Sequence, residues 1–268
     1  MEPPAMIHVT LHAKVMPSTI DTGKPLVILH GLFGMGDNWG SHARHWASKG
    51  MHVHLLDMRN HGRSAHVPIH TYEAMSEDVR QYLLTHFPQQ SVTLLGHSMG
   101  GKVAMHLACH HPELVEKLLV ADIGPKAYPP HHKEVIEAMH ALDLSSIQSR
   151  MEADRAMEKH LPSRSLRQFL LKNLTWKQDK QLGWKFNLPI LSSQIQRIGT
   201  ALDPIAIYHG ATLFVRGLAS GYILDEDIPD ILTHFPLAQL ESIEGAGHWL
   251  HAEKPEAFRE AVESFICD

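Results

Sequence analysis

Ser98 lies in the middle of a Gly-x-Ser-x-Gly pattern at residues 96–100. A serine hydroxyl can act as a nucleophile when a tight strand-to-helix turn presents it, and glycines before and after the serine remove side chains that would collide there. An apolar run at 92–95 precedes the pattern and a helix-like segment follows it, as this turn requires. The pattern predicts that Ser98 is the nucleophile of an acyl-transfer reaction.

An oxyanion forms when a serine attacks an acyl carbonyl, and backbone amides usually stabilise it. The helix that begins after Ser98 directs its first amides, that of Met99 above all, toward this position. A second glycine-containing loop, His-Gly-Leu-Phe-Gly at 30–34, follows the apolar run at 26–29. We expect the amide of Leu32 in this loop to be the other donor. A phosphate-binding loop is a weak alternative, because the Lys-Ser/Thr pair of such loops is missing.

The general base is expected in the glycine-rich segment at 245–255, which follows a strand-like run at 237–243. A histidine in a turn after the last strand can reach over the edge of the sheet toward the serine. His248 is the preferred candidate because it directly follows the glycines. His251 is the alternative, and its other interpretation is a core or capping histidine.

Short, continuously apolar runs separated by helical patterns must position these residues. Strands that are buried on both faces have this character, which predicts a parallel sheet with helices on both sides, an α/β fold. Residues 72–86 place apolar side chains three and four positions apart, as one face of a helix does. Residues 6–15 alternate apolar and polar positions, which predicts an antiparallel edge strand or pair. The buried runs lie at 26–30, 53–57, 92–96, 118–122 and 212–216.

The alternation of strands and helices breaks between about 125 and 204. Helix-like segments at 131–143, 147–160, 163–174 and 189–200 occupy this stretch. We interpret residues 125–201 as a helical cap inserted after the sixth core strand, and residues 1–124 and 202–268 as the core. The cap has apolar side chains available for an acyl-binding wall or for packing onto the core: Met139, Leu142, Met151, Met157, Phe169, Leu170, Trp176, Trp184 and Phe186.

The composition of the 268 residues excludes several functional classes. With 44% hydrophobic and 20% charged residues the chain can bury a core, and a net charge of −5 without charge runs gives no footprint for nucleic acid or an anionic membrane. Two cysteines, no signal-like N-terminus and no apolar stretch of about 20 residues favour a cytoplasmic protein without membrane insertion. The 23 histidines show no metal-binding spacing, so we expect no metal or other cofactor and place most of them on the surface.

Four motifs occur in order along the chain: HGLFG at 30–34, DMRNHGRS at 57–64, GHSMGG at 96–101 and GAGHWLHAEKP at 245–255. Together they resemble the α/β-hydrolase superfamily, and in particular the small bacterial esterases of the YbfF type. The resemblance implies a carboxylic-ester hydrolase in which Ser98 is the nucleophile, His248 the base, and the amides of Leu32 and Met99 the oxyanion donors. In the 57–64 loop it suggests that Asp57 and Arg59 hold the loop, whereas His61 could face the substrate.

The third member of the triad departs from the common pattern of that superfamily. Most members place the acid a few residues after the next-to-last core strand, but the corresponding positions, 218–220, carry no carboxylate. An aspartate at the end of the preceding strand is an alternative known in this fold, and Asp122 occupies that position. It preserves the order serine, aspartate, histidine and would hold the imidazole tautomer. We therefore favour Asp122 over Asp225.

These residues predict acyl transfer to Ser98 and then to water, with a small-molecule acyl ester or thioester, such as an acyl-CoA, as substrate. A serine nucleophile argues against haloalkane dehalogenases and epoxide hydrolases, which share the fold but use an aspartate. A cofactor-free perhydrolase or a carbon–carbon bond hydrolase would use the same triad and stays open as an alternative. A non-catalytic ligand sensor is the alternative from another class.

Overall fold

The computed structural model describes residues 8–18, 25–129, 132–177 and 181–267. Its core is a seven-stranded sheet with the strand order β1-β3-β2-β4-β5-β8-β9. Strand β1 is antiparallel to β3, and every other neighbouring pair is parallel. The strands are β1 (Ala13–Met16), β2 (Pro25–Leu29), β3 (His52–Leu56), β4 (Val92–His97), β5 (Val115–Ala121), β8 (Ala211–Gly217) and β9 (Ala238–Ile243).

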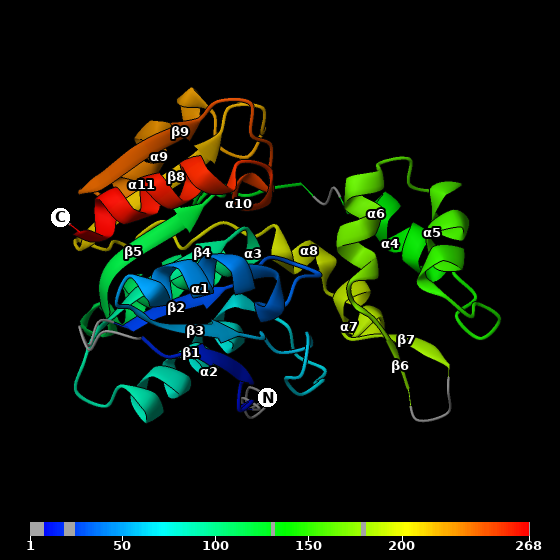
Figure 1. Cartoon of the computed structure of the whole chain (residues 1–268). Helices are drawn as coiled ribbons and strands as arrows, with labels where there is room; N and C mark the ends of the chain where they lie inside the picture. Colours follow the sequence, from blue (N-terminus) through cyan, green and yellow to red (C-terminus); the bar gives the residue numbers. More distant parts are fainter. Residues whose placement is uncertain (1–7, 19–24, 130–131, 178–180, 268) are drawn as a thin grey trace, which may run out of the picture.

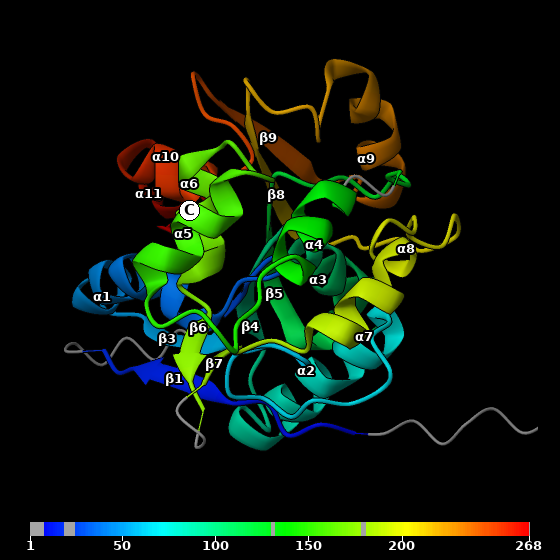
Figure 2. The same cartoon turned by 90° about the vertical axis from the view of Figure 1, so that its right-hand side faces the viewer.

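Helices cover both faces of this sheet because its central strands are apolar on both faces. In β2, Leu26 and Ile28 belong to a cluster with residues of α1 (Gly40–Ser48) and α11 (Pro255–Cys267). The alternate residues of β2, Val27 and Leu29, belong to a second cluster with α2 (Tyr72–His86), α3 (Met99–His110) and α9 (Ile228–His234). Figure 2 shows the sheet rising from β1 to β9 between these helices.

The chain between β5 and β8, residues 122–210, leaves the sheet and contains the insertion. Figure 1 shows it to one side of the core, on the side to which β5 and β8 point. It contains five helices and a hairpin among its described residues: α4 (Lys133–His140), α5 (Arg150–Glu158), α6 (Arg164–Leu171), β6 (Leu174–Trp176), β7 (Leu182–Trp184), α7 (Leu188–Ser193) and α8 (Ile195–Ile198).

Two details differ from the sequence-based expectation. The hairpin of β6 and β7 was not predicted, because strands of three residues are too short to show an alternating pattern. The insertion was placed after a sixth strand by counting a pair at 6–15, whereas the described residues contain β1 alone before β2, and residues 6 and 7 lie outside the description. The insertion therefore follows the fifth strand described.

Short 3₁₀ and α-helical turns complete the fold near the site. Segment η1 (Gly36–Trp39) follows the loop after β2, η2 (Pro112–Leu114) precedes β5, and η3 (Asp225–Asp227) precedes α9. Helix α10 (Leu250–Glu253) follows the loop after β9. Within the described residues, no helix is both long and apolar enough to span a bilayer.

Candidate active site

Ser98 occupies the sharp turn between β4 and α3. Its backbone has φ 53° and ψ −119°, a left-handed conformation that is uncommon for any residue with a side chain. The two glycines of the pattern allow the chain to approach itself here. A Cβ on Gly96 would lie 2.2 Å from the Gly100 carbonyl oxygen, and one on Gly100 would lie 2.4 Å from the Leu29 carbonyl oxygen. The turn therefore depends on glycine at both positions.

The predicted base and acid lie next to this serine in one line of hydrogen bonds. His248 Nε2 is 3.0 Å from Ser98 Oγ, and His248 Nδ1 is 2.8 Å from Asp122 Oδ2. Asp122 directly follows β5, and His248 lies in the loop after β9. The parallel strands β4, β5 and β9 end at the same edge of the sheet, which brings the three residues together there. With Nδ1–H donating to the carboxylate, Nε2 is left to accept the serine proton.

Asp122 is completely buried and is held by further donors. The amide of Gly217 donates to its Oδ1 at 3.1 Å, and the Ser220 hydroxyl donates to its Oδ2 at 2.5 Å. Burial raises the pKa of Asp122 to about 6, and the hydrogen bonds from Ser220 and Gly217 act in the opposite direction. Ser220 was missed as a site residue by the sequence analysis. Its position could have indicated it, because it lies among residues 218–220, where most members of the superfamily place the acid.

Asp225, the alternative acid, is not part of this arrangement. Its carboxylate pairs with Arg216 at 2.6 Å, and its side chain is 85% exposed. Among the described side chains, Asp122 is the carboxylate that contacts the imidazole of His248.

The loop after β2 lies beside Ser98, and hydrogen bonds to His61 and within the loop fix its conformation. Phe33 has φ 59°, and its amide donates to His61 Nε2 at 3.2 Å. The amide of Gly34 donates to the Gly31 carbonyl at 2.9 Å. These two amides are thus bound to other acceptors, and the amide of Leu32 directly precedes them in the loop.

His61 can accept this hydrogen bond because it is neutral. Its Nδ1 lies 3.0 Å from the Arg59 carbonyl and donates to it, which leaves the lone pair of Nε2 for the amide of Phe33. Complete burial and the neighbouring imidazoles hold the pKa of His61 well below its usual range. His61 therefore supports the loop from behind and does not face a substrate.

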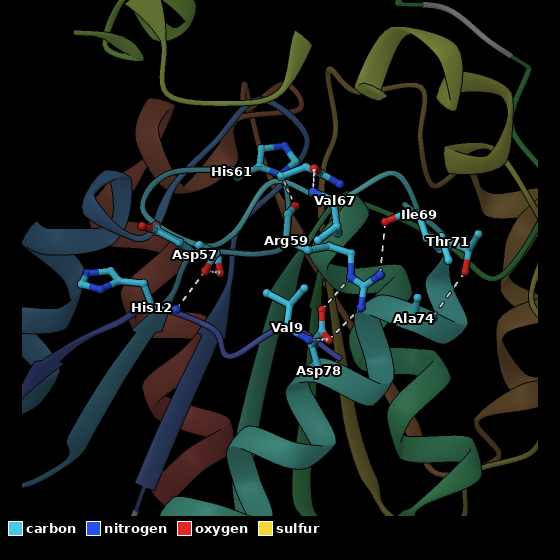
Figure 3. A network of polar contacts seen from close by, with 12 residues as sticks. Val9, His12, Asp57, Arg59, His61, Val67, Ile69, Thr71, Ala74 and Asp78 are labelled. Carbon is cyan, nitrogen blue, oxygen red and sulfur yellow. Dashed lines mark hydrogen bonds and ion pairs between the residues drawn. The ribbon is translucent and has the colours of Figure 1, made fainter. Parts of the chain in front are cut away.

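The loop at 57–64 is held by the charged side chains that the sequence singled out (Figure 3). Asp57 accepts hydrogen bonds from the amides of Gly36 and Arg63, at 2.7 and 2.9 Å. Arg59 forms a two-point ion pair with Asp78 of α2, with N–O distances of 2.6 and 2.7 Å. Both residues act structurally, as expected.

Two further histidines near the triad are neutral parts of the core. His97 Nε2–H donates to the carbonyl of His248 at 2.8 Å and so joins the serine turn to the loop of the base. Burial lowers the pKa of His97 to about 3. His251 is buried and stacks on Trp39, with ring centroids 4.2 Å apart. His251 is therefore a core histidine, the second interpretation given to it above.

The expectation that most histidines lie on the surface is only partly met. Most described histidines are at least partly exposed, but a substantial minority is buried. All of these except His70 form hydrogen bonds or stack on an aromatic ring, which a composition count cannot reveal; the ring nitrogens of His70 have no hydrogen-bond partner among the described residues. The buried histidines are His30, His42, His54, His61, His70, His97, His234 and His251.

A cavity of about 210 Å³ opens onto Ser98 between the core and the insertion. From the core it is lined by the loop after β2 and by His248 and Trp249. The insertion contributes Val135 of α4 and Leu166, Phe169 and Leu170 of α6. Of the nine apolar side chains named above for the insertion, only Phe169 and Leu170 line this cavity. Met151 and Trp176 are exposed, and the other five are buried.

The described residues show no cluster of three or more histidine, cysteine or carboxylate side chains that could hold a metal ion. Ser98, His248 and Asp122 form a hydroxyl–imidazole–carboxylate arrangement, which can perform acyl transfer.

Comparison with known proteins shows the family of the chain. The family model described as "alpha/beta hydrolase fold" matches residues 24–255. The chain is 41% identical to the sn-1-specific diacylglycerol lipase ABHD11 of Danio rerio, over 90% of this chain and 78% of that protein. It is 37% identical to esterase YbfF of Escherichia coli (strain K12), over 91% of this chain and 93% of that protein.

A solved structure described as a marine microorganism esterase is also similar. It superposes with a TM-score of 0.91 at 39% identity and covers 96% of this chain and 99% of that chain. The match of fold, motifs and length confirms the resemblance found from the sequence. The chain belongs to the α/β-hydrolase fold family.

Proposed function

We propose that this chain, a carboxylic-ester hydrolase, cleaves small-molecule esters or thioesters through an acyl-enzyme formed on Ser98. His248 is the general base and acid, and Asp122 fixes its tautomer and stabilises the imidazolium. The amides of Leu32 and Met99 bind the oxyanion. The insertion acts as a cap that supplies part of the cavity wall above the serine.

The reaction proceeds in two transfers of one acyl group. His248 Nε2 takes the Ser98 proton while Oγ bonds to the carbonyl carbon, and the carbonyl oxygen becomes an anion next to the two amides. The C–O or C–S bond of the substrate then breaks, and Nε2 returns the proton to the leaving alcohol or thiol. In the second transfer Nε2 takes a proton from water, which attacks the acyl carbon and releases the acid and Ser98.

One observation carries this proposal: a serine in strained backbone geometry lies 3.0 Å from an imidazole that is itself 2.8 Å from a buried carboxylate. Strain of this kind costs about 1–3 kcal/mol and is retained mainly where function needs it. Two similar proteins, a diacylglycerol lipase and an esterase, and the similar solved structure of an esterase support an ester as the substrate.

The test is labelling with a fluorophosphonate probe together with hydrolysis of a panel of p-nitrophenyl esters and acyl-CoA thioesters. The wild-type chain is expected to be labelled on Ser98 and to hydrolyse esters. Ser98→Ala should lose the label and about six orders of magnitude in kcat, as triad serines do elsewhere. Ser41→Ala, a change at an exposed serine of α1, is the matched control and should retain both.

Hydrolysis by Ser98→Ala at the wild-type rate would reject the mechanism. A labelled protein that hydrolyses no ester or thioester in the panel would reject ester hydrolysis and redirect attention to the other reactions of this triad.

A further inference from the structure

Two cavities of very different size meet at Ser98. The larger is the cavity of about 210 Å³ described above, and the smaller has a volume of about 20 Å³. They share four lining residues: Leu32, Ser98, His132 and Tyr222. A substrate whose carbonyl carbon bonds to Ser98 therefore has two directions available for its two substituents.

The base, His248, lies on the side of the larger cavity. His248 lines the larger cavity and is not among the described residues that line the smaller one. The ring of Tyr222, which borders both cavities, stacks on His248 with centroids 3.8 Å apart. Tyr222 is thus positioned between the imidazole and the smaller cavity.

Proton transfer decides which substituent enters which cavity. The leaving oxygen must lie within hydrogen-bond reach of His248 Nε2 when the C–O bond breaks, so the alcohol extends on the side of the base. The carbonyl oxygen faces the amides of Leu32 and Met99. The remaining substituent, the acyl side chain, is directed to the smaller cavity, which Met99 also lines.

The smaller cavity limits the length of that side chain. On the same measure it offers about a tenth of the space of the larger cavity, 20 against 210 Å³, so it suits the shorter of the two substituents. Its walls include the side chains of Ile123, Ile195 and Ile198, so it suits an apolar group. A longer chain would have to displace these side chains.

Hydrogen bonds hold the wall that α8 contributes. The Tyr72 hydroxyl donates to the Ile198 carbonyl at 2.5 Å, and the amide of Tyr128 donates to the Gly199 carbonyl at 2.8 Å. A Cβ on Gly199 would lie 2.1 Å from the Tyr128 carbonyl oxygen, so the two segments are in close contact. The wall is fixed to the core and to the start of the insertion.

We propose that the preferred substrates are esters of short acids, of acetyl to propionyl size, with larger apolar alcohols. The acyl side chain enters the 20 Å³ cavity, and the alcohol occupies the 210 Å³ cavity against Leu166 and Phe169. This assignment rests on the proposed function and specifies its substrate class. The bonds made and broken are those of the two transfers given above, with an acetyl-sized group on Ser98 and the apolar alcohol released with the proton from Nε2.

The experiment compares two series of esters on the full chain. The first keeps p-nitrophenol and lengthens the acid from acetate to decanoate, and the second keeps acetate and lengthens the alcohol from ethyl to octyl. For wild type, kcat/KM should fall beyond propionate by about tenfold or more per misfitting methylene. In the second series kcat/KM should rise with alcohol length as apolar surface is buried.

Variants on the two walls should change the two series separately. Ile198→Ala and Ile195→Ala widen the smaller cavity and should move the optimum of the acid series to butyrate or longer, with the alcohol series unchanged. Phe169→Ala removes a wall of the larger cavity and should flatten the alcohol series. It should leave the preferred acid length unchanged, although the rates of all p-nitrophenyl esters can fall together. Thermal melting of each variant checks that it is folded.

Two results would overturn the assignment. One is a wild-type optimum at hexanoate or longer in the acid series. The other is a shift of the preferred acid length in Phe169→Ala and not in Ile198→Ala. In both cases dependence on Ser98 would leave the proposed function standing. Hydrolysis of acetate esters that survives Ser98→Ala would instead reject the proposed function itself.

Discussion

The phenol ring of Tyr222 lies almost parallel to the imidazole of His248, with centroids 3.8 Å apart and an angle of 12° between the planes. Its backbone is anchored on both sides, because its amide donates to Ser220 Oγ and its carbonyl accepts from the Tyr128 hydroxyl. Burial raises the pKa of Tyr222 to about 12, so the ring is a neutral phenol wherever the triad works. The imidazole therefore becomes a cation against the face of a fixed aromatic ring, which attracts it.

Replacing this ring tests its contribution to the base. Tyr222→Leu keeps an apolar side chain but removes the aromatic face, and we expect kcat to fall about tenfold, because aromatic stacking and cation–π contacts contribute about 1–1.5 kcal/mol. Tyr222→Phe keeps the face and should stay within about threefold of wild type by the same estimate. Steady-state kinetics on p-nitrophenyl acetate makes the comparison. Equal losses in both variants would assign the effect to the hydroxyl and contradict the stacking role.

The identity of the acid is tested by paired amide substitutions. Asp122→Asn removes the charge opposite His248 Nδ1 and should lower kcat by about four orders of magnitude, by analogy with the same change in other triads. Asp225→Asn alters an exposed pair with Arg216 and should change kcat less than twofold, because exposed pairs contribute little. If only Asp225→Asn impaired the enzyme, Asp122 would not be the acid.

The sequence predicted the sheet and the sharp turn at Ser98 well because both depend on local patterns. The five buried apolar runs became β2, β3, β4, β5 and β8, since a strand covered on both faces must be apolar at every position. The glycines around Ser98 are required by contacts within a few residues of the turn. The triad could be proposed because Ser98 and Asp122 directly follow core strands and His248 lies in the loop after another, and parallel strands end at the same edge of the sheet.

The residues that the sequence analysis missed act through contacts across the chain. Ser220 binds Asp122 from 98 positions away, and the place of Tyr222 against His248 depends on how two loops pack. Tyr222 has no periodicity or spacing that marks it, and Ser220 is marked only by its place at 218–220. The burial of so many histidines was missed because it too depends on packing across the chain, whereas the hairpin of β6 and β7 is too short to show a pattern.

The ion pair of Arg59 and Asp78 should contribute to stability because it is buried on both sides. The side chains are 1% and 0% exposed, and Asp78 also accepts a hydrogen bond from the Val9 amide (Figure 3). Arg59→Met would leave a carboxylate in the core without its cation, at a cost of about 3–5 kcal/mol. For a chain of this size that corresponds to a fall in Tm of roughly 6–20 °C, measurable by calorimetry.

The control for this change is an exposed arginine. Arg63→Met removes a guanidinium that is 59% exposed and lies 3.6 Å from Asp37, and its Tm should fall by less than about 2 °C because such pairs are screened by solvent. Similar Tm values for Arg59→Met and wild type would mean that the pair does not stabilise the fold.

The hydroxyl of Ser220 should set the pH at which the enzyme loses activity on the acid side. Asp122 has to be ionised to stabilise the imidazolium, and its pKa of about 6 means that kcat/KM should fall as the pH decreases through that value. The hydrogen bond from Ser220 favours the ionised carboxylate, so Ser220→Ala should raise the pKa of Asp122 further and move the acid limb to higher pH. A hydrogen bond to a charged group contributes about 1.5–3 kcal/mol, which corresponds to a shift of about one pH unit or more. Ser220→Thr keeps the hydroxyl and should keep the wild-type profile, whereas an acid limb that stayed in place in Ser220→Ala would show that Ser220 does not tune the carboxylate.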